Sequence, residues 1–130
     1  MRPDARLLAI EIDPALHAHA ANVIRDPRLT VHLGSAEQLA EALAIYQLPA
    51  PDVVVSCLPF STMPPELANR IAAEIARVLA PAGRLVAYQA RAQLPRHATP
   101  HLGAPEWQWE WFNIPPVRVF TWTKGLAQAR

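Results

Sequence analysis

Short apolar runs alternate along this chain with longer segments in which apolar residues recur at helical spacing. The apolar runs cover residues 6–12, 29–33, 52–55 and 84–89. The segments with helical spacing cover residues 14–24, 37–46 and 65–79. Apolar runs of this kind are typical of strands in parallel sheets, and the periodic segments are typical of helices that cover such sheets. The pattern therefore predicts an α/β fold.

The stretch from Asp52 to Phe60 organises this prediction. Its β-branched residues lie between prolines and predict a strand that is buried on both faces. In open α/β sheets, ligands bind beyond the carboxyl ends of the strands. We therefore expect Ser56 and the following Cys57, Leu58, Pro59 and Phe60 to lie at the front of any site.

Local signals set the ends of the helices. Asp13 followed by Pro14 predicts a helix start, and Asp26 before Pro27 predicts where that helix has ended. Ser35 stands three residues before Gln38, which is capping-box spacing. The resulting order predicts one three-layer domain over residues 1–130, with a mostly parallel sheet and right-handed crossovers.

The end of the chain has a different pattern. Large aromatic residues alternate over residues 107–112, a turn follows, and residues 117–123 are β-branched and aromatic, which predicts an antiparallel hairpin at the sheet edge. Trp107, Trp109 and Trp111 project from one side of the first strand, and packing against the sheet is favoured over a lipid-facing surface. Residues 90–105 show no clear periodicity, so this long connection is either functional or loosely ordered.

Composition and charge narrow the functional classes. The 130 residues are 52% hydrophobic and carry a formal net charge of +1, without a basic cluster of the kind that binds duplex DNA. Cys57 is the only cysteine, which excludes an intramolecular disulfide and fits a reducing compartment, so we expect a cytoplasmic protein. His97 and His101 have metal-compatible spacing, but no further ligands stand near them in the sequence.

Several motifs resemble, in order, those of class I S-adenosylmethionine-dependent methyltransferases. They are Ile10-Glu11-Ile12-Asp13, Gly34-Ser35-Ala36-Glu37, Ser56-Cys57-Leu58-Pro59-Phe60, Leu79-x-Pro81-x-Gly83 and the terminal hairpin. The Leu-Pro-Phe turn, Met63-Pro64 and residues 113–116 look most like bacterial phospholipid N-methyltransferases, which methylate phosphatidylethanolamine. The resemblance extends from Leu7 to Lys124 and implies a Rossmann-like fold.

The resemblance also implies a cofactor, S-adenosylmethionine, and the residues that bind it. Glu11, with Ile12, would bind the ribose hydroxyls, as carboxylates do at this position of dinucleotide sites; the simpler alternative is an exposed acid at a strand end. Ser35, Ala36 and Glu37 would contact the adenine, and Ser56 would complete the set. Ser35 stands where the family usually has an aspartate, and its alternative role is a helix N-cap.

Cys57, Leu58, Pro59 and Phe60 would form the wall beside the transferred methyl group. The proline fixes the backbone so that carbonyls face an incoming amine, and the aromatic ring can hold a cation; a structural turn with Phe60 in the core is the alternative. The implied function is N-methylation of phospholipid head-group amines, with peripheral contact at the inner membrane face. A nucleic-acid adenine methylase is disfavoured, because Cys57 replaces the asparagine of the related Asn-Leu-Pro-Tyr motif.

One part of the family pattern is missing. The family begins with a strand, a glycine-rich loop and a helix, whereas the four glycines of this chain stand far apart. The missing strand would lie between the strands that end at Glu11 and Ser56. We expect that the reading frame starts at an internal Met1; the alternatives are a non-catalytic remnant that no longer binds the cofactor, and strand exchange with a second copy.

Overall fold

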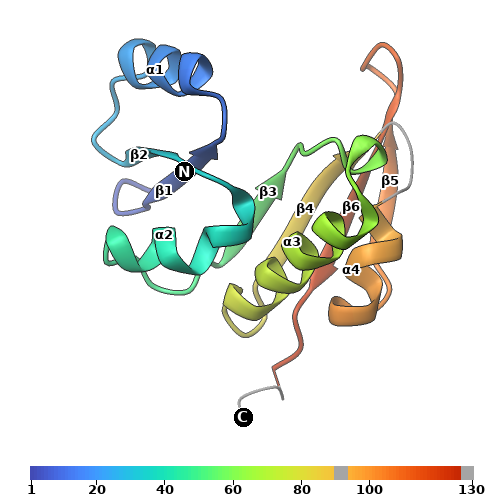
Figure 1. Cartoon of the computed structure of the whole chain (residues 1–130). Helices are drawn as coiled ribbons and strands as arrows, with labels where there is room; N and C mark the ends of the chain where they lie inside the picture. Colours follow the sequence, from blue (N-terminus) through green and yellow to red (C-terminus); the bar gives the residue numbers. More distant parts are fainter. Residues whose placement is uncertain (90–93, 127–130) are drawn as a thin grey trace. The chain divides into compact units, whose positions relative to one another are not determined.

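A computed structural model describes residues 1–89 and 94–126. The contacts group the chain into two compact units, Met1–Leu48 and Pro49–Arg130, and each is described by itself. The strands form two separate sheets, one in each unit (Figure 1). The α/β class predicted from the sequence is confirmed; the single domain over 1–130 stays a prediction.

The first unit is a small parallel βαβ arrangement followed by a helix. Its elements are β1 (Leu7–Glu11), α1 (Pro14–Val23), β2 (Leu29–Leu33), a 3₁₀ turn (Ala36–Gln38) and α2 (Leu39–Ile45). Strands β1 and β2 pair in parallel, with Leu7 opposite Leu29 and Glu11 opposite Leu33. Helix α1 starts as predicted, because the Asp13 carboxylate accepts hydrogen bonds from the amides of Ala15 (2.7 Å) and Leu16 (3.2 Å).

The second unit contains a four-stranded sheet and two helices. Its elements are β3 (Val53–Ser56), a 3₁₀ turn (Phe60–Thr62), α3 (Pro65–Val78), β4 (Arg84–Gln89), α4 (Leu94–Leu102), β5 (Glu106–Glu110) and β6 (Val117–Thr123). The strand order is β3-β4-β6-β5. Strand β3 is parallel to β4, and β6 is antiparallel to both β4 and β5, as the predicted terminal hairpin requires.

The core of the second unit lies on one face of this sheet. Leu85 is paired with Trp122 and Ala87 with Phe120, so these four side chains share a face, and all are buried. Figure 1 shows α3 and α4 on the same side of the sheet. Their buried residues complete the core: Ala68, Ile71, Ala72 and Ile75 from α3, and Leu94 and Ala98 from α4.

Strand β3 is not buried on both faces, so that prediction is wrong. Its partner across one edge is β4, and in the sheets of the described residues its other edge carries no strand. Val54 and Ser56 point to the helix-covered face, whereas Val53 and Val55 point to the other face and are 48% and 58% exposed. The reason is that α3 and α4, the helices of this unit, both lie on one side.

The connection at residues 90–105 holds a helix that the sequence pattern did not reveal. Residues 90–93 lie outside the described residues, but Leu94–Leu102 form α4. Its buried face is only Leu94 and Ala98, one turn apart, and the helix contains Pro100 near its end. Two apolar positions and an internal proline are too weak a periodic signal to predict a helix.

The strands predicted to flank the missing strand are both edge strands. In the first sheet β1 pairs with β2 alone, and in the second sheet β3 pairs with β4 alone, as far as the described residues go. Each therefore presents an unpaired row of backbone donors and acceptors. None of the described helices is long and apolar enough to cross a membrane.

Candidate functional site

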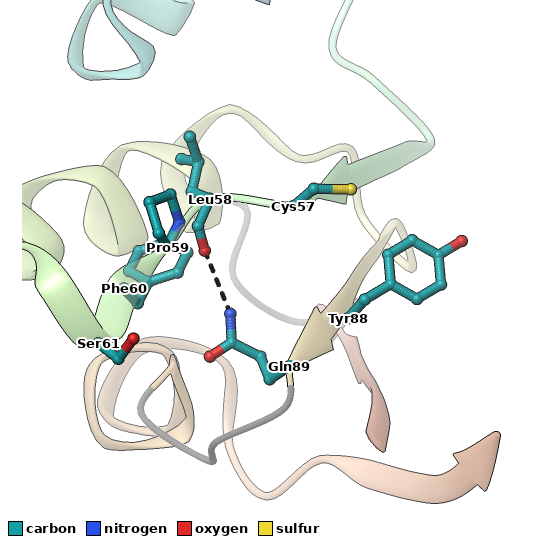
Figure 2. A pocket seen from close by; sticks show the side chains of 7 residues that line it. All are labelled: Cys57, Leu58, Pro59, Phe60, Ser61, Tyr88 and Gln89. Atoms are coloured by element: carbon teal, nitrogen blue, oxygen red, sulfur yellow. Dashed lines mark hydrogen bonds between the residues drawn. The ribbon is translucent and has the colours of Figure 1, made fainter. Parts of the chain in front are cut away.

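A cavity lies where β3 and β4 of the second unit end. It measures about 260 Å³ and is open to solvent. Because the two strands are parallel and Ser56 pairs with Ala87, the residues that follow each strand meet at one edge of the sheet. The cavity is lined by Cys57, Leu58, Pro59, Phe60, Ser61, Tyr88 and Gln89 (Figure 2). The structure thus brings together the four residues predicted to form the substrate-side wall.

Hydrogen bonds fix the turn that forms this wall. The amide of Leu58 donates to the Ser56 hydroxyl (3.4 Å), and the Leu58 carbonyl accepts from the Phe60 amide (2.9 Å). The Pro59 carbonyl accepts from both the amide and the hydroxyl of Thr62, each at 3.0 Å. The Leu58 and Pro59 carbonyls therefore accept hydrogen bonds within the turn, and the expectation that carbonyls of this turn face an amine stays a prediction.

Gln89 and Tyr88 are site residues that the sequence reasoning missed. The Gln89 side-chain nitrogen donates to the Leu58 carbonyl (3.3 Å), which joins the end of β4 to the turn after β3. Figure 2 shows that the two side chains leave β4 on opposite sides. Gln89 is 7% exposed and Tyr88 is 46% exposed. The available signal in the sequence was that both residues end a predicted strand, and ligands in such sheets bind beyond the strand ends.

The lining combines a buried floor with an exposed rim. Phe60 is 3% exposed, so the core role and the cavity role that the sequence left open are both filled by one side chain. Cys57 lies on the exposed side. Among the seven lining residues there is no carboxylate, lysine or histidine. Such a cavity can position an amine in line with an activated methyl group. Transfer of a methyl group to an amine depends chiefly on this orientation.

Five of the predicted cofactor residues lie together at one edge of the first unit. Glu11 ends β1 and Gly34 follows β2, and the Gly34 amide donates to the Glu11 carbonyl (3.0 Å). One oxygen of the Glu11 carboxylate accepts from the Asp13 amide (2.9 Å). Ile12 is 72% exposed. Ala36 and Glu37 follow in the 3₁₀ turn, so this edge carries the acid and the loop that the resemblance assigns to the nucleoside.

Ser35 serves as an N-cap in the structure. Its hydroxyl accepts from the Glu37 amide (3.2 Å) and lies 3.5 Å from the Glu37 carboxylate. An adenine amino group would therefore compete with these bonds. Ser56, the sixth predicted cofactor residue, belongs to the second unit and is 5% exposed, with its hydroxyl bonded to the turn.

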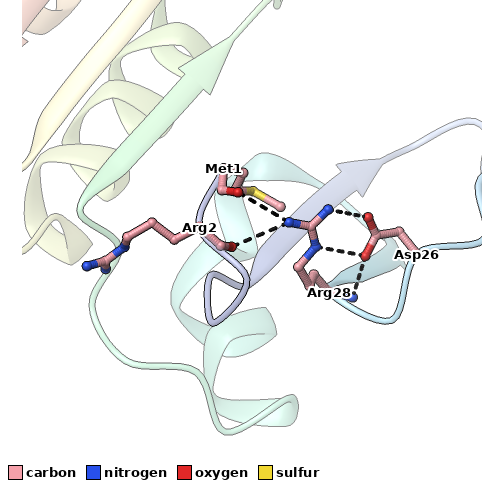
Figure 3. A network of polar contacts seen from close by, with 4 residues as sticks. All are labelled: Met1, Arg2, Asp26 and Arg28. Atoms are coloured by element: carbon pink, nitrogen blue, oxygen red, sulfur yellow. Dashed lines mark hydrogen bonds and ion pairs between the residues drawn. The ribbon is translucent and has the colours of Figure 1, made fainter.

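A charged network anchors the start of β2, the strand that leads to the Ser35 loop. The Arg28 guanidinium donates to the Asp26 carboxylate at 2.6 and 3.0 Å and also contacts the carbonyls of Met1 and Arg2, both at 3.4 Å (Figure 3). The Arg28 side chain and amide hydrogen bonds lower the pKa of Asp26 from 3.8 to about 2. The network thus ties the amino-terminal residues to the second strand.

The histidine pair lies on α4, where His97 and His101 are one turn apart. The His97 imidazole Nδ1 is 2.9 Å from the Asn69 side-chain oxygen of α3, so it links the two helices. Among the described residues no three histidine, cysteine or acidic side chains form a group that could hold a metal ion.

This architecture is similar to that of solved methyltransferase structures. The N-methyltransferase NodS from Bradyrhizobium japonicum WM9 superposes with a TM-score of 0.71 and 14% identity, over 92% of this chain and 74% of NodS. A TehB-like SAM-dependent methyltransferase from Corynebacterium glutamicum gives 0.66 and 18%, over 92% and 68% of the two chains. The fold is that of the Rossmann-like methyltransferases.

A third solved methyltransferase is also similar. Precorrin-6Y C5,15-methyltransferase from Geobacter metallireducens GS-15 gives a TM-score of 0.63 and 16% identity, over 94% of this chain and 69% of that one. No family model matches this sequence, and no curated protein matches it either. This chain covers 74%, 68% and 69% of these three solved chains. One fold hosts many functions, so the fold alone does not set the substrate.

Proposed function

We propose that this chain is an S-adenosylmethionine-dependent methyltransferase and that its acceptor is the amine of a phospholipid head group. The observation that carries the proposal is the cavity formed by the Cys57–Ser61 turn and Gln89 at the carboxyl edge of the sheet. It belongs to a fold shared with NodS, an N-methyltransferase that has also been solved with S-adenosyl-L-homocysteine. The proposed location is the cytoplasm, at the inner face of the membrane.

The residues present fit the nucleoside part of the cofactor. The Glu11 carboxylate ends a parallel strand and uses one oxygen on the Asp13 amide, which leaves an acceptor for ribose hydroxyls. Ala36 and Glu37 would lie beside the adenine, whereas Ser35 would have to exchange its cap for a ligand bond. When bound, the cofactor would supply the activated methyl group.

The methionine part of the cofactor needs a backbone that approaches closely, and glycines provide it. Residues 1–130 contain only Gly34, Gly83, Gly103 and Gly125. We propose that a glycine-rich loop outside residues 1–130 completes the methionine side of the site, in preference to exchange with a second copy.

On the acceptor side, this chain's residues position and shield the amine. The bonded Leu58-Pro59-Phe60 turn forms a rigid wall, and Phe60 offers an aromatic face to a cationic group. The hydroxyl of Tyr88 and the side-chain oxygen of Gln89 are acceptors available to an amine N–H. With these roles assigned, Cys57 lies on the rim of the cavity and does not act as a nucleophile.

Calorimetric titration with S-adenosylmethionine tests the cofactor. We expect weak binding by the 130-residue chain, stronger binding once a segment with a glycine-rich loop is added, and about tenfold weaker binding by Glu11→Gln, because a charge-assisted bond is lost. Glu41→Gln, an exposed acid of α2, is the matched control and should bind normally. No heat with about millimolar ligand in either form would instead favour a non-catalytic remnant.

Transfer of radiolabelled methyl groups tests the acceptor. Label should enter phosphatidylethanolamine vesicles and leave ribosomal RNA unlabelled. The reverse result would replace the phospholipid proposal by adenine methylation.

A further inference from the structure

The hairpin that closes the sheet carries a large exposed aromatic surface, which we call the aromatic hairpin (residues 107–118). The tryptophans predicted to pack against the sheet do not do so: Trp107, Trp109 and Trp111 are 55%, 39% and 67% exposed. Beyond them, Phe112 and Ile114 at the turn are 98% and 96% exposed. An exposed apolar patch of this extent marks an interaction surface.

The tryptophans are ordered by contacts with one another and with one cation. Trp109 stacks on Trp111 with ring centroids 5.1 Å apart, and Trp107 meets Trp109 edge to face at 6.4 Å. The Arg118 guanidinium lies over the rings of Trp107 and Trp109, 5.9 and 5.1 Å from their centroids. The aromatic surface is therefore held in place before any partner binds.

Polarity changes in steps along the aromatic hairpin. Residues 112–117 at the turn include no charge. Trp111, Trp109 and Trp107 follow in that order away from the turn, and Arg118 pairs with Trp109 and so lies level with the tryptophans. Glu106 and Glu110 alternate with the tryptophans along β5 and so leave the strand on the opposite face, where the Glu110 carboxylate accepts a hydrogen bond from the Phe112 amide (3.2 Å). A bilayer has the same order: hydrocarbon first, then an interface in which tryptophan rings lie at the level of the charged head groups.

The aromatic hairpin lies at the same edge of the sheet as the candidate site. Trp109 pairs with Arg118, and Arg118 pairs with Gln89, so three adjacent strands place these residues side by side. Figure 1 shows the loop between β5 and β6 at the end of the sheet where β3 and β4 finish. Adjacent strands are about 4.8 Å apart, a step that an ethanolamine arm can span between Arg118 and the cavity.

We propose that the aromatic hairpin docks on a phospholipid bilayer, with Phe112 and Ile114 inserted, the tryptophans at the interface and Arg118 at a head-group phosphate. Its last element, delivery of the head-group amine to the cavity at Gln89, rests on the proposed function. Docking itself depends only on the hairpin. A second copy of the chain is the competing occupant, but a surface with graded polarity and an uncharged tip fits a lipid interface better than a uniform protein face.

Vesicles of phosphatidylethanolamine and phosphatidylcholine test the docking with the full chain. Three of the four tryptophans lie in the hairpin, and Trp122 is fully buried, so a blue shift of the emission on adding vesicles reports the hairpin. We expect co-sedimentation, a blue shift, and quenching by lipids that carry a quencher in the upper acyl chain. Little loss of binding is expected as salt is raised, because insertion is mainly apolar.

The double variant Phe112→Ser with Ile114→Ser, which we call the tip variant, should weaken vesicle binding at least about tenfold. The reason is that two large apolar side chains are no longer transferred from water into the bilayer. Both residues are almost fully exposed, so the fold should be unaffected. The matched control is Val23→Ser with Ile45→Ser, which removes two exposed apolar side chains from helices of the first unit and should bind normally.

Three results would overturn the docking: no binding to these vesicles, equal binding by the tip variant, or self-association without lipid that the tip variant abolishes. The outcomes separate from those of the proposed function. Methyl transfer to a short-chain, monomeric phosphatidylethanolamine without vesicle binding would refute docking alone. Vesicle binding without any S-adenosylmethionine binding would refute the methyltransferase proposal and leave docking intact.

Discussion

The two units of the chain differ sharply in how much apolar surface they bury. Among the described residues, every buried apolar side chain except Ala42 belongs to the second unit, where α3 and α4 cover one face of a four-stranded sheet. The first unit exposes about half or more of Leu7, Leu16, Val23 and Ile45, which its sequence pattern places on apolar faces. A two-stranded sheet with two helices has too little surface to cover them.

The difference indicates which unit would be stabilised more by a bound ligand or by an added segment. The residues proposed for the nucleoside, Glu11 and Ser35–Glu37, are carried by the unit with the thinner core, whereas the cavity proposed for the acceptor belongs to the well-buried unit. A ligand or segment that binds only the folded form stabilises it by mass action. The first unit should therefore gain more from completion of the site than the second.

The largest test of this contrast is a pair of leucine truncations. Leu85→Ala removes a fully buried side chain from the second unit and should lower the free energy of unfolding by about 2–5 kcal/mol. Leu16→Ala in α1, at a side chain 56% exposed, should cost less than about 1 kcal/mol. Urea denaturation followed by tryptophan fluorescence and far-ultraviolet circular dichroism measures both; equal losses would contradict the contrast.

A smaller effect is expected from adding a methyl group at one glycine in each unit. A Cβ at Gly83 would lie 2.7 Å from the Ala80 carbonyl oxygen and 3.2 Å from that of Asp52, both backbone atoms that cannot move away, so Gly83→Ala should cost about 1–3 kcal/mol. At Gly34 the nearest atom, at 2.8 Å, belongs to the His32 side chain, which can turn aside at the cost of its hydrogen bond to the Tyr46 hydroxyl (3.0 Å). Gly34→Ala should therefore be the milder variant in thermal unfolding, and the opposite order would show that the first unit is the more rigid.

The smallest effect is a pH dependence confined to the first unit. The pKa of Asp26 is lowered from 3.8 to about 2 by Arg28, so folding favours the ionised carboxylate. The stabilisation is complete above pH 3.8 and is lost as the pH falls toward 2. Hydrogen exchange of the Leu29 amide should show this loss, and Asp26→Asn should remove it. A profile that Asp26→Asn leaves unchanged would assign the acid sensitivity to other groups.

The sequence predicted most of the fold because the local signals and the tertiary contacts agree. Asp13 before Pro14 marks a capped helix start, and the strand at Arg84–Gln89 has the predicted bounds. Prediction failed where burial depends on neighbours. Val53 and Val55 are apolar like any buried strand, and only the one-sided placement of α3 and α4 exposes them. Helix α4 was not predicted because its buried face consists of only two residues, Leu94 and Ala98.

The candidate site was predicted in part for the same reason. The turn comes directly after a strand that was predicted, so it could be expected to line a cavity. Phe60 does line the cavity. Gln89 was missed because its role depends on the register of β4 beside β3, which no local pattern encodes. The roles of Glu11 and Ser35 toward a nucleoside stay predictions, since they depend on a ligand and not on the chain's own contacts.

The lone sulfhydryl at Cys57 makes the cavity directly observable. Because this thiol is exposed on the rim and has no counterpart elsewhere in the sequence, one maleimide dye or one spin label would attach at a single defined point. The rate of that alkylation can be followed while candidate acceptors are added. The protein thus carries its own reporter of whether the space beside Pro59 is filled.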